Sequence, residues 1–138
     1  MSFKWIDKYS CNITEIDKQH KKLFEIGDRL YALASLNDAY DHYDEIMDIF
    51  NELKEYTIYH FDYEEKLMEK YGYQNIDSHK IEHMFLLKKA QKYEKQDIDA
   101  DQLKSTNDLI AFVSDWITSH ILQTDMQYKS FFNEKGIY

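Results

Sequence analysis

Apolar residues recur at alternating spacings of three and four along most of this chain, which is the period of an amphipathic α-helix. The pattern is clear in the first segment, where Ile16, Leu23 and Leu30 would share one face. Short polar stretches interrupt it and divide the chain into segments. The pattern therefore predicts four helices, over approximately residues 15–36, 41–71, 78–95 and 101–133.

Residues typical of helix ends support these boundaries. Thr14, followed three residues later by Asp17, is typical of a capping box at the start of the first helix. Gly72 is a natural end for the second helix, and Asp77 or Ser78 could cap the third. Because the connections are short, neighbouring helices would run antiparallel. The predicted fold class is therefore all-α, an up-down-up-down four-helix bundle.

Residues 1–14 lack helical periodicity and are predicted to form an N-terminal arm. They carry large apolar side chains at Phe3, Trp5, Tyr9 and Ile13. Such side chains gain free energy when they are buried, so we expect the arm to pack along the outside of the bundle. The sequence shows no internal repeat or low-complexity tract, and residues 1–138 are predicted to form a single domain.

Composition and charge narrow the class of protein. Hydrophobic residues make up 43% of the 138 residues, charged residues make up 31%, and proline is absent, as expected for a folded protein of long helices. The formal net charge of −9 disfavours nucleic acid as a partner. No apolar run resembles a membrane span or a signal peptide. We therefore expect no membrane partner. Cys11 is the single cysteine and cannot form an internal disulfide, so we expect a cytoplasmic protein.

Five of the six histidines fall on the inward faces of the predicted helices. A lone inward histidine is usually a hydrogen-bonded core residue, but burying five together without partners would cost about 1–3 kcal/mol apiece. A marginally stable fold does not absorb that cost, and a bound metal removes it. The sixth histidine, His42, precedes His60 by about 27 Å of helix and is expected to be solvated. The pattern therefore predicts a buried metal site.

Two pairs of candidate ligands stand four residues apart in the sequence. His60 and Glu64 form one pair, and His79 and His83 form the other. Residues at this spacing lie on one face of a helix, about 6 Å apart, so both members of a pair can reach one metal centre. We therefore expect the second and third helices to contribute two ligands each.

The candidate pair on the fourth helix, His120 and Asp125, stands five residues apart. On an ideal helix this spacing separates two side chains by about 140° around the axis. Either the two ligands approach the metal from different sides, or the helix widens locally into a π-type turn. His20 is the single candidate on the first helix.

Position along the helices brings these candidates to one level. His20, His79 and His83 lie near the starts of the first and third helices, and the other candidates lie near the ends of the second and fourth. In an antiparallel bundle these starts and ends lie at the same height. The predicted metal ligands in this layer are His20, His60, Glu64, His79, His83, His120 and Asp125.

The number of candidate ligands indicates two metal ions. Five imidazoles and two carboxylates are too many for one four-coordinate zinc. Two octahedral ions offer about twelve positions, and the imidazoles, two bridging carboxylates and a bridging oxo or hydroxo group would fill all but about one of them. An open position among apolar side chains suits a small diatomic molecule. Imidazole-rich ligation favours iron among the metals that would fit.

Four motifs combine these residues. They are Ile16-Asp17-Lys18-Gln19-His20, His60-Phe61-x-x-Glu64-Glu65-x-x-Met68, His79-x-x-x-His83-x-Phe85 and Trp116-x-x-x-His120-Ile121-x-x-x-Asp125-x-x-Tyr128. Together they resemble the signature of the hemerythrin family, and in particular its bacterial single-domain form. The resemblance covers essentially the whole chain, because the four motifs occur in order on corresponding helices.

The resemblance implies reversible binding of dioxygen at a non-haem di-iron centre, for storage, transport or delivery of oxygen. One iron would be held by three histidines and the other by two, and the second iron would keep the open position. The implied assignment is His79, His83 and His120 on one iron, His20 and His60 on the other, and Glu64 and Asp125 as bridges beside an oxo or hydroxo group.

Several residues beside the predicted ligands fit either packing or function. Tyr56 and Tyr63 lie near the layer by register, where packing is the simpler role. Glu65 and Glu82 stand next to ligands, and each either points to solvent or orients an imidazole. The candidates for the lining of the ligand pocket are Ile16, Leu23, Phe24, Trp116, Ile117 and Ile121.

Other functions fit parts of the pattern. A di-iron oxidase or peroxidase, acting on peroxide, nitric oxide or an organic substrate, would usually carry several glutamates and Glu-x-x-His motifs, and this sequence has no such motif. An oxygen or redox sensor would need a partner or a second domain to receive its signal. A structural zinc bundle would need fewer ligands. A non-enzymatic oxygen-binding protein is therefore the leading hypothesis.

Overall fold

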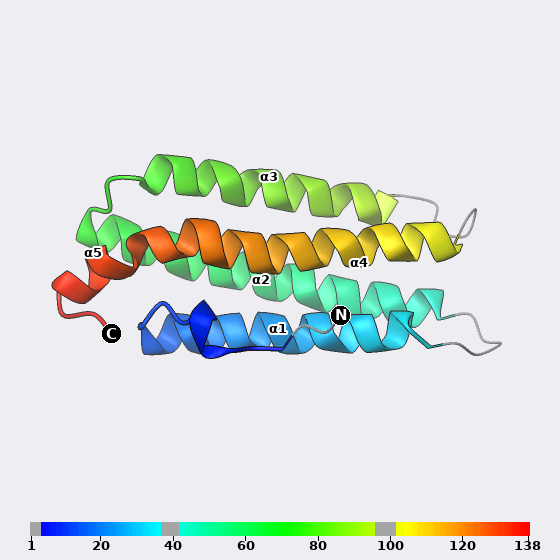
Figure 1. Cartoon of the computed structure of the whole chain (residues 1–138). Coiled ribbons are helices and arrows are strands. Elements are labelled where there is room, and N and C mark those ends of the chain that lie inside the picture. The colour runs from blue at the N-terminus through cyan, green and yellow to red at the C-terminus, as the bar shows by residue number, and fades with distance from the viewer. Residues whose placement is uncertain (1–3, 37–41, 96–101) are drawn as a thin grey trace.

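Four long helices lie side by side in the computed structural model, and neighbours along the chain run antiparallel (Figure 1). The structure describes residues 4–36, 42–95 and 102–138. Helices α1 (Thr14–Ala34), α2 (Tyr43–Tyr71), α3 (Ile76–Lys95) and α4 (Gln102–Ser119) form the bundle. The described residues contain no strand, and the predicted all-α bundle is confirmed. Phe3 and the predicted first residues of the second and fourth helices, 41 and 101, lie outside the described residues.

The fourth predicted helix has the expected extent but is not regular. After α4 the chain passes through a π-helical segment, His120–Thr124, and a 3-10 segment, Asp125–Tyr128. A short helix, α5 (Lys129–Glu134), completes this part of the chain. Figure 1 shows α5 bending away at the end of the bundle that also holds the turn between α2 and α3. This change of geometry lies at the predicted ligands of the fourth helix.

The first helix begins differently from the predicted capping box. Thr14 is already the first helical residue, and Ile13 before it makes no side-chain cap hydrogen bond. Asp17 instead accepts hydrogen bonds from the arm, from the backbone N–H of Cys11 at 2.8 Å and from the hydroxyl of Ser10. A buried backbone N–H without a partner costs free energy, so the carboxylate is better used on the arm than on the helix end. The capping prediction was therefore wrong.

The ends of α2 and α3 show one prediction confirmed and one corrected. Gly72 ends α2 with φ of 72°, a left-handed conformation that glycine adopts without strain. Helix α3 begins at Ile76, two residues earlier than predicted. Asp77 and Ser78 therefore lie within its first turn, where the Ser78 hydroxyl donates to the backbone carbonyl of Asn75.

The N-terminal arm packs against α1, as predicted. The rings of Trp5 and Phe24 meet edge to face with their centroids 5.8 Å apart, and the Tyr9 ring lies 4.7 Å from the same phenylalanine. Aromatic pairs in this range add about 0.5–1.5 kcal/mol each beyond the area they bury. A 3-10 turn, Asp7–Tyr9, sets the direction of the arm. The arm therefore shields one face of α1 close to His20.

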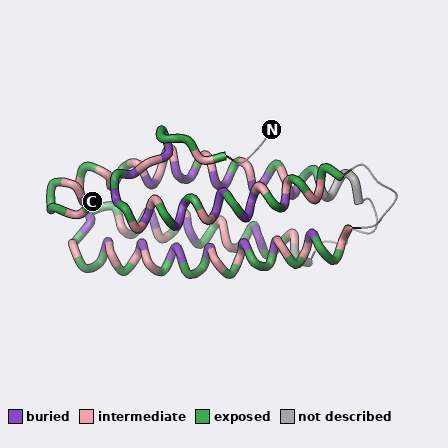
Figure 2. The backbone as a smooth tube through the Cα atoms, turned by 90° about the horizontal axis from the view of Figure 1, so that it is seen from below, coloured by how far each residue is buried: buried purple, intermediate pink, exposed green. Residues whose placement is uncertain are grey.

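Buried residues recur along the length of each helix (Figure 2) and form two hydrophobic clusters. The larger cluster includes Leu23, Phe61 and Ile121, whereas the smaller one includes Met68 and Tyr128. Along α1, α2 and the fourth helical stretch, the predicted ligands have members of one cluster before them in the sequence and members of the other cluster after them. The core is therefore apolar on both sides of a polar layer. Within the described residues, no helix combines the length and apolar character that crossing a bilayer requires.

Candidate metal centre

The seven predicted ligands are all buried and converge in one layer of the bundle. They form two groups that share both carboxylates. In each group, one nitrogen or oxygen of every residue lies within 4.8 Å of the corresponding atoms of the others. The first group is Glu64, His79, His83, His120 and Asp125, and the second is His20, His60, Glu64 and Asp125. Five imidazoles and two carboxylates therefore surround two neighbouring points.

The first group is built around one oxygen from each carboxylate. Glu64 Oε2 lies 3.2 Å from the Nε2 atom of His79 and 3.3 Å from that of His83. Asp125 Oδ1 lies 3.1 Å from His79 Nε2 and 3.0 Å from His120 Nε2. Three imidazoles from α3 and the π-helical segment thus face one oxygen of Glu64 and one of Asp125.

The second group uses the other oxygen of each carboxylate. Glu64 Oε1 lies 2.9 Å from His60 Nε2 and 3.4 Å from His20 Nε2. Asp125 Oδ2 lies 3.0 Å from His20 Nε2. Each carboxylate therefore turns one oxygen to the three-histidine group and the other to the two-histidine group. This is the arrangement that two bridging carboxylates need.

The π-helical segment explains how His120 and Asp125 join the same group. The backbone N–H of Asp125 bonds to the carbonyl of His120, five residues earlier, which is the hydrogen bond of a π-helix. The extra residue in the turn brings the His120 imidazole to 3.0 Å from the Asp125 carboxylate. Of the two explanations for the five-residue spacing, local widening is therefore correct.

Glu65 and Glu82 orient imidazoles rather than pointing freely into solvent. Glu65 Oε2 lies 3.1 Å from His83 Nδ1, and Glu82 Oε1 lies 2.9 Å from His120 Nδ1. A carboxylate only accepts, so each Nδ1 must carry the proton and each Nε2 is left as a ligand for a metal. Glu82 also accepts from the Thr124 hydroxyl at 2.8 and 2.6 Å, which ties α3 to the π-helical segment.

Gln19 and Tyr128 contact the centre, and neither was singled out from the sequence. Gln19 Oε1 accepts from His60 Nδ1 at 2.7 Å, while the Gln19 amide donates to Glu15 and so keeps its oxygen turned to the histidine. The Tyr128 hydroxyl donates to Glu64 Oε1 at 3.0 Å and is fully buried. Both residues occur in the four sequence motifs. They could have been identified from the sequence as polar side chains next to the helix faces that carry the predicted ligands.

Several ligand atoms are close together yet not hydrogen bonded. Among the described residues, the Nε2 atoms of His60, His83 and His120 and both oxygens of Asp125 are buried without a hydrogen-bond partner. His60 Nε2 and Glu64 Oε1 are 2.9 Å apart, so orientation rather than distance prevents the bond. These atoms lie within 4.8 Å of one another in their groups without forming hydrogen bonds, although buried polar atoms usually have partners. The donor set therefore fits bound cations.

Without metal, buried histidines and carboxylates of opposite charge face one another in the layer. Burial alone would lower the pKa of His79 and His120, but the Asp125 and Glu64 carboxylates outweigh it and raise the pKa of these histidines to about 9 and about 10. Burial opposes ionisation of Asp125, and the facing histidines nevertheless hold its pKa well below the ordinary value. For His60, by contrast, burial prevails and lowers the pKa. Both carboxylates are thus anionic and available as ligands.

The six residues predicted to line a ligand pocket are all buried beside the layer. Trp116 also lines a surface pocket of about 140 Å³ with Glu82 and His120. Their role as a lining for dioxygen stays a prediction. The six are Ile16, Leu23, Phe24, Trp116, Ile117 and Ile121.

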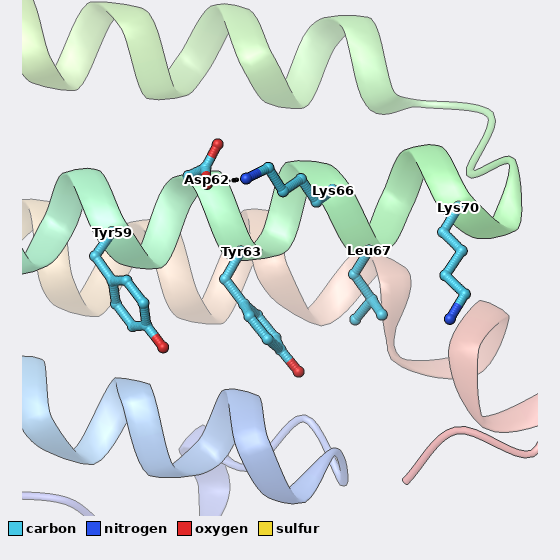
Figure 3. Close-up of a pocket in the computed structure, with 6 residues that line it drawn as sticks. All are labelled: Tyr59, Asp62, Tyr63, Lys66, Leu67 and Lys70. Carbon is cyan, nitrogen blue, oxygen red and sulfur yellow. Dashed lines mark ion pairs between the residues drawn. The ribbon is translucent and has the colours of Figure 1, made fainter.

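A larger pocket of about 450 Å³ is lined by residues of α2, and Tyr63 is among them. Figure 3 shows Tyr59 and Tyr63 extending from α2 toward α1, whereas Lys70 extends toward the C-terminal segment. None of the seven predicted ligands lines this pocket. It is therefore separate from the histidine layer.

His42 lies outside the layer, as predicted, but it is less solvated than expected. It immediately precedes α2, and its Nδ1 atom is 3.4 Å from Glu45 Oε1. Its side chain is only 15% exposed. The expectation of a freely solvated histidine was therefore wrong.

Comparison with known proteins agrees with this geometry. The model of the hemerythrin HHE cation binding domain matches residues 11–132. Bacteriohemerythrin of Clostridium acetobutylicum is 41% identical over 126 residues, which are 91% of this chain and 98% of that protein. Bacteriohemerythrin of Methylococcus capsulatus is 30% identical over 88% of each chain, and a hemerythrin-like protein of Naegleria gruberi is 31% identical over 92% of this chain and 91% of its own. The chain belongs to the hemerythrin family.

Proposed function

We propose that this protein binds dioxygen reversibly at a pair of non-haem irons held in the histidine layer. The observation that carries the proposal is the sharing of Glu64 and Asp125 between two groups of histidines, with one oxygen of each carboxylate turned to each group. A single ion would not use both oxygens of both carboxylates in this way. Two ions at neighbouring points would, and membership of the hemerythrin family supports iron as the metal.

The two irons would differ in how many protein ligands they have. Three histidines face one point and two face the other, so the second iron would keep a position for dioxygen once an oxo or hydroxo group bridges the pair. The iron pair would supply the electrons that make dioxygen binding favourable and reversible. The proposed ligands are His79, His83 and His120 for one iron, His20 and His60 for the other, and Glu64 and Asp125 for both.

The chain itself positions the ligands and excludes water. Gln19 and Glu82 fix the ring orientation of His60 and His120 through their Nδ1 atoms. Tyr128 donates to Glu64, and its ring stacks on His79 with the centroids 5.7 Å apart. Hydrophobic residues pack on both sides of the layer, so a bound diatomic molecule would be held away from bulk water. These features support binding without further reaction.

Cycles of oxygenation test the proposal directly. The reduced, iron-loaded protein is expected to be colourless under nitrogen, to become coloured in air, and to lose the colour under vacuum over several cycles. Oxidation that occurs once and does not reverse, or rapid consumption of a reductant, would instead support a di-iron oxidase or peroxidase.

A cytoplasmic location and the absence of nucleic-acid partners stay predictions from the sequence.

Replacing His83 with alanine is expected to lower the iron content while leaving the helices formed. The His83 imidazole faces Glu64 at 3.3 Å and stacks on Phe61 at a centroid distance of 3.6 Å. Losing residues that merely support a ligand costs about 10–100-fold in metal affinity, so loss of a ligand should cost at least as much. Iron per chain, measured beside circular dichroism, checks this.

His42→Ala is the matched control, because it removes an imidazole outside the layer. It is expected to keep the full iron content and the colour in air. Equal iron loss in the two variants would contradict the assignment.

A further inference from the structure

The outer face of α3 carries a stripe of exposed apolar side chains. Ile81 is 49% exposed, Met84 is 52% exposed and Phe85 is 66% exposed. Their spacing of three and four residues places them together on one side of the helix. Single exposed apolar residues are ordinary on protein surfaces, but a contiguous group of them typically marks an interaction site.

Positive charge extends this stripe along the same helix face. Lys88 and Lys92 follow Phe85 at helical spacing, and both are exposed. Helix α3 contains five lysines and three acidic residues, whereas α2 contains nine acidic residues and three lysines. Exposed Asp77 lies four residues before Ile81, so the basic part of the stripe is its end at Lys88 and Lys92. In a chain of net charge −9, this end is a basic and apolar surface on an acidic molecule. The positive charge of the stripe complements a partner with an acidic surface.

The stripe lies opposite the metal layer. His79 and His83 are on α3 as well, and a spacing of two residues from Ile81 places both on the other side of the helix. A helix with its side chains is about 10–12 Å across, so a protein seated on the stripe would approach the proposed irons to roughly that distance. Figure 1 shows α3 at the edge of the bundle, with one long side of the helix away from the other helices.

We propose that the outer stripe of α3, formed by Ile81, Met84, Phe85, Lys88 and Lys92, docks an acidic one-electron carrier protein. The proposal rests on the proposed di-iron function. An iron pair that has lost its electrons to oxygen is diferric and must be reduced before it binds dioxygen again. Each reduced carrier would give one electron, so two successive encounters convert two ferric ions to ferrous ions and leave two oxidised carriers.

The composition of the stripe suits a short-lived complex of this kind. Transient redox complexes bury less than about 1,200 Å², and their apolar centre is surrounded by polar and charged residues. Here Phe85 and Met84 would form the centre, and Lys88 and Lys92 would steer an acidic carrier by long-range attraction. A second copy of this chain could also offer an acidic surface through α2. The sedimentation experiment below tests for this self-association.

A plant-type [2Fe–2S] ferredoxin is the probe, because its potential of about −400 mV makes it a strong one-electron donor. Binding is measured first, by NMR titration of the oxidised ferredoxin with the iron-loaded diferric protein, which requires no electron transfer or oxygen. The rate constant for reduction of the diferric protein by reduced ferredoxin is then measured by stopped flow without oxygen, at increasing salt concentrations.

Phe85→Ser and the double variant Lys88→Glu/Lys92→Glu are expected to weaken ferredoxin binding and to lower the second-order rate constant at least tenfold. The controls are Tyr59→Ser and Lys66→Glu/Lys70→Glu, which change an exposed aromatic residue and two exposed lysines at the same spacing on α2. These should behave as the parent protein does. Salt should slow reduction of the parent protein more than that of the charge variant.

Three results would overturn the proposal: no ferredoxin binding by the parent protein, equal losses in the α3 and α2 variants, or self-association in sedimentation experiments that Phe85→Ser abolishes. Because the binding measurement does not involve dioxygen, it separates this proposal from the proposed function. Loss of reversible oxygenation with intact ferredoxin binding would count against the function alone.

Discussion

Replacing Glu64 with alanine is expected to reduce the iron content from two per chain to less than one. Glu64 is shared by both ligand groups and lies within 3.4 Å of His20, His60, His79 and His83. Removing it takes one anionic ligand from each proposed iron at once. Because loss of a supporting residue already weakens metal binding by about 10–100-fold, loss of a shared ligand should exceed that range. Iron per chain after exhaustive dialysis measures the effect.

Two further variants separate ligand loss from general damage. Asp62→Ala removes a carboxylate two residues away on α2, where Asp62 is exposed and pairs with Lys66; it is expected to retain two irons. Glu64→Gln keeps the volume of the side chain but removes its charge and one acceptor oxygen, so it should lose iron without leaving a cavity. Two irons retained by a folded Glu64→Ala protein would show that Glu64 does not bridge.

The height of the ligand layer could be predicted because it depends only on helical period and antiparallel order. His60 and Glu64 share a helix face whatever surrounds them, and the same holds for His79 and His83. Once neighbouring helices alternate in direction, the starts of two helices and the ends of the other two must lie together. Both conditions can be read from a single sequence. The structure places all seven residues in that layer.

The contacts between helices could not be predicted in the same way. Thr124 and Glu82 are far apart in sequence, and their hydrogen bond depends on the π-helical turn that the five-residue spacing alone left open. Gln19 pairs with His60 on another helix. Asp17 had two competing uses, the helix end and the arm, and the sequence shows only the first. In each case the choice is made by packing between segments, which periodicity does not encode.

The sequence predicted a buried layer, but the residues that cover it above and below could not be predicted, since they depend on side-chain packing between helices. The two hydrophobic clusters come from all four helices, from the arm and from α5. Tyr128 belongs to the smaller cluster and also donates to Glu64, so the apolar core and the ligand layer are joined at this residue. A stable core on both sides is what allows buried histidines to be held with unpaired nitrogens.

Without metal, the protein is expected to lose stability as the pH rises from 6.5 to 8.5. His79 and His120 have an ordinary pKa of 6.5 when unfolded, and nearby carboxylates raise it to about 9 and about 10 in the folded protein. The folded state therefore holds a proton on each of these histidines that the unfolded state releases in this interval. The Asp125 carboxylate also outweighs burial at His20 and raises the pKa of that histidine, which adds a loss of the same sign. Their stabilisation is fully present below pH 6.5 and is lost as the pH rises through the folded pKa values.

The expected loss over these two pH units is about 2 kcal/mol for each histidine, at about 1.4 kcal/mol per unit of pKa. That is a large part of the 5–15 kcal/mol by which an ordinary domain is stable. Urea unfolding of chelator-treated protein at pH 6.5, 7.5 and 8.5 measures it. The interval avoids the Cys11 thiol and the Tyr128 phenol, whose ordinary pKa values are 9.0 and 10.0. It also avoids acid titration of Asp125, because its pKa is lowered well below this range.

Iron should reverse this pH dependence, because a metal-bound imidazole nitrogen cannot carry a proton. Metal uptake near pH 7 must then release the protons of His79 and His120, and metal affinity should rise with pH where the metal-free protein becomes less stable. Asp125→Asn should flatten the loss in the metal-free protein, since it removes a carboxylate that faces both histidines. Constant stability between pH 6.5 and 8.5 in the metal-free parent protein would contradict this account. It would mean that the carboxylates do not keep His79 and His120 protonated in the folded protein before metal binds.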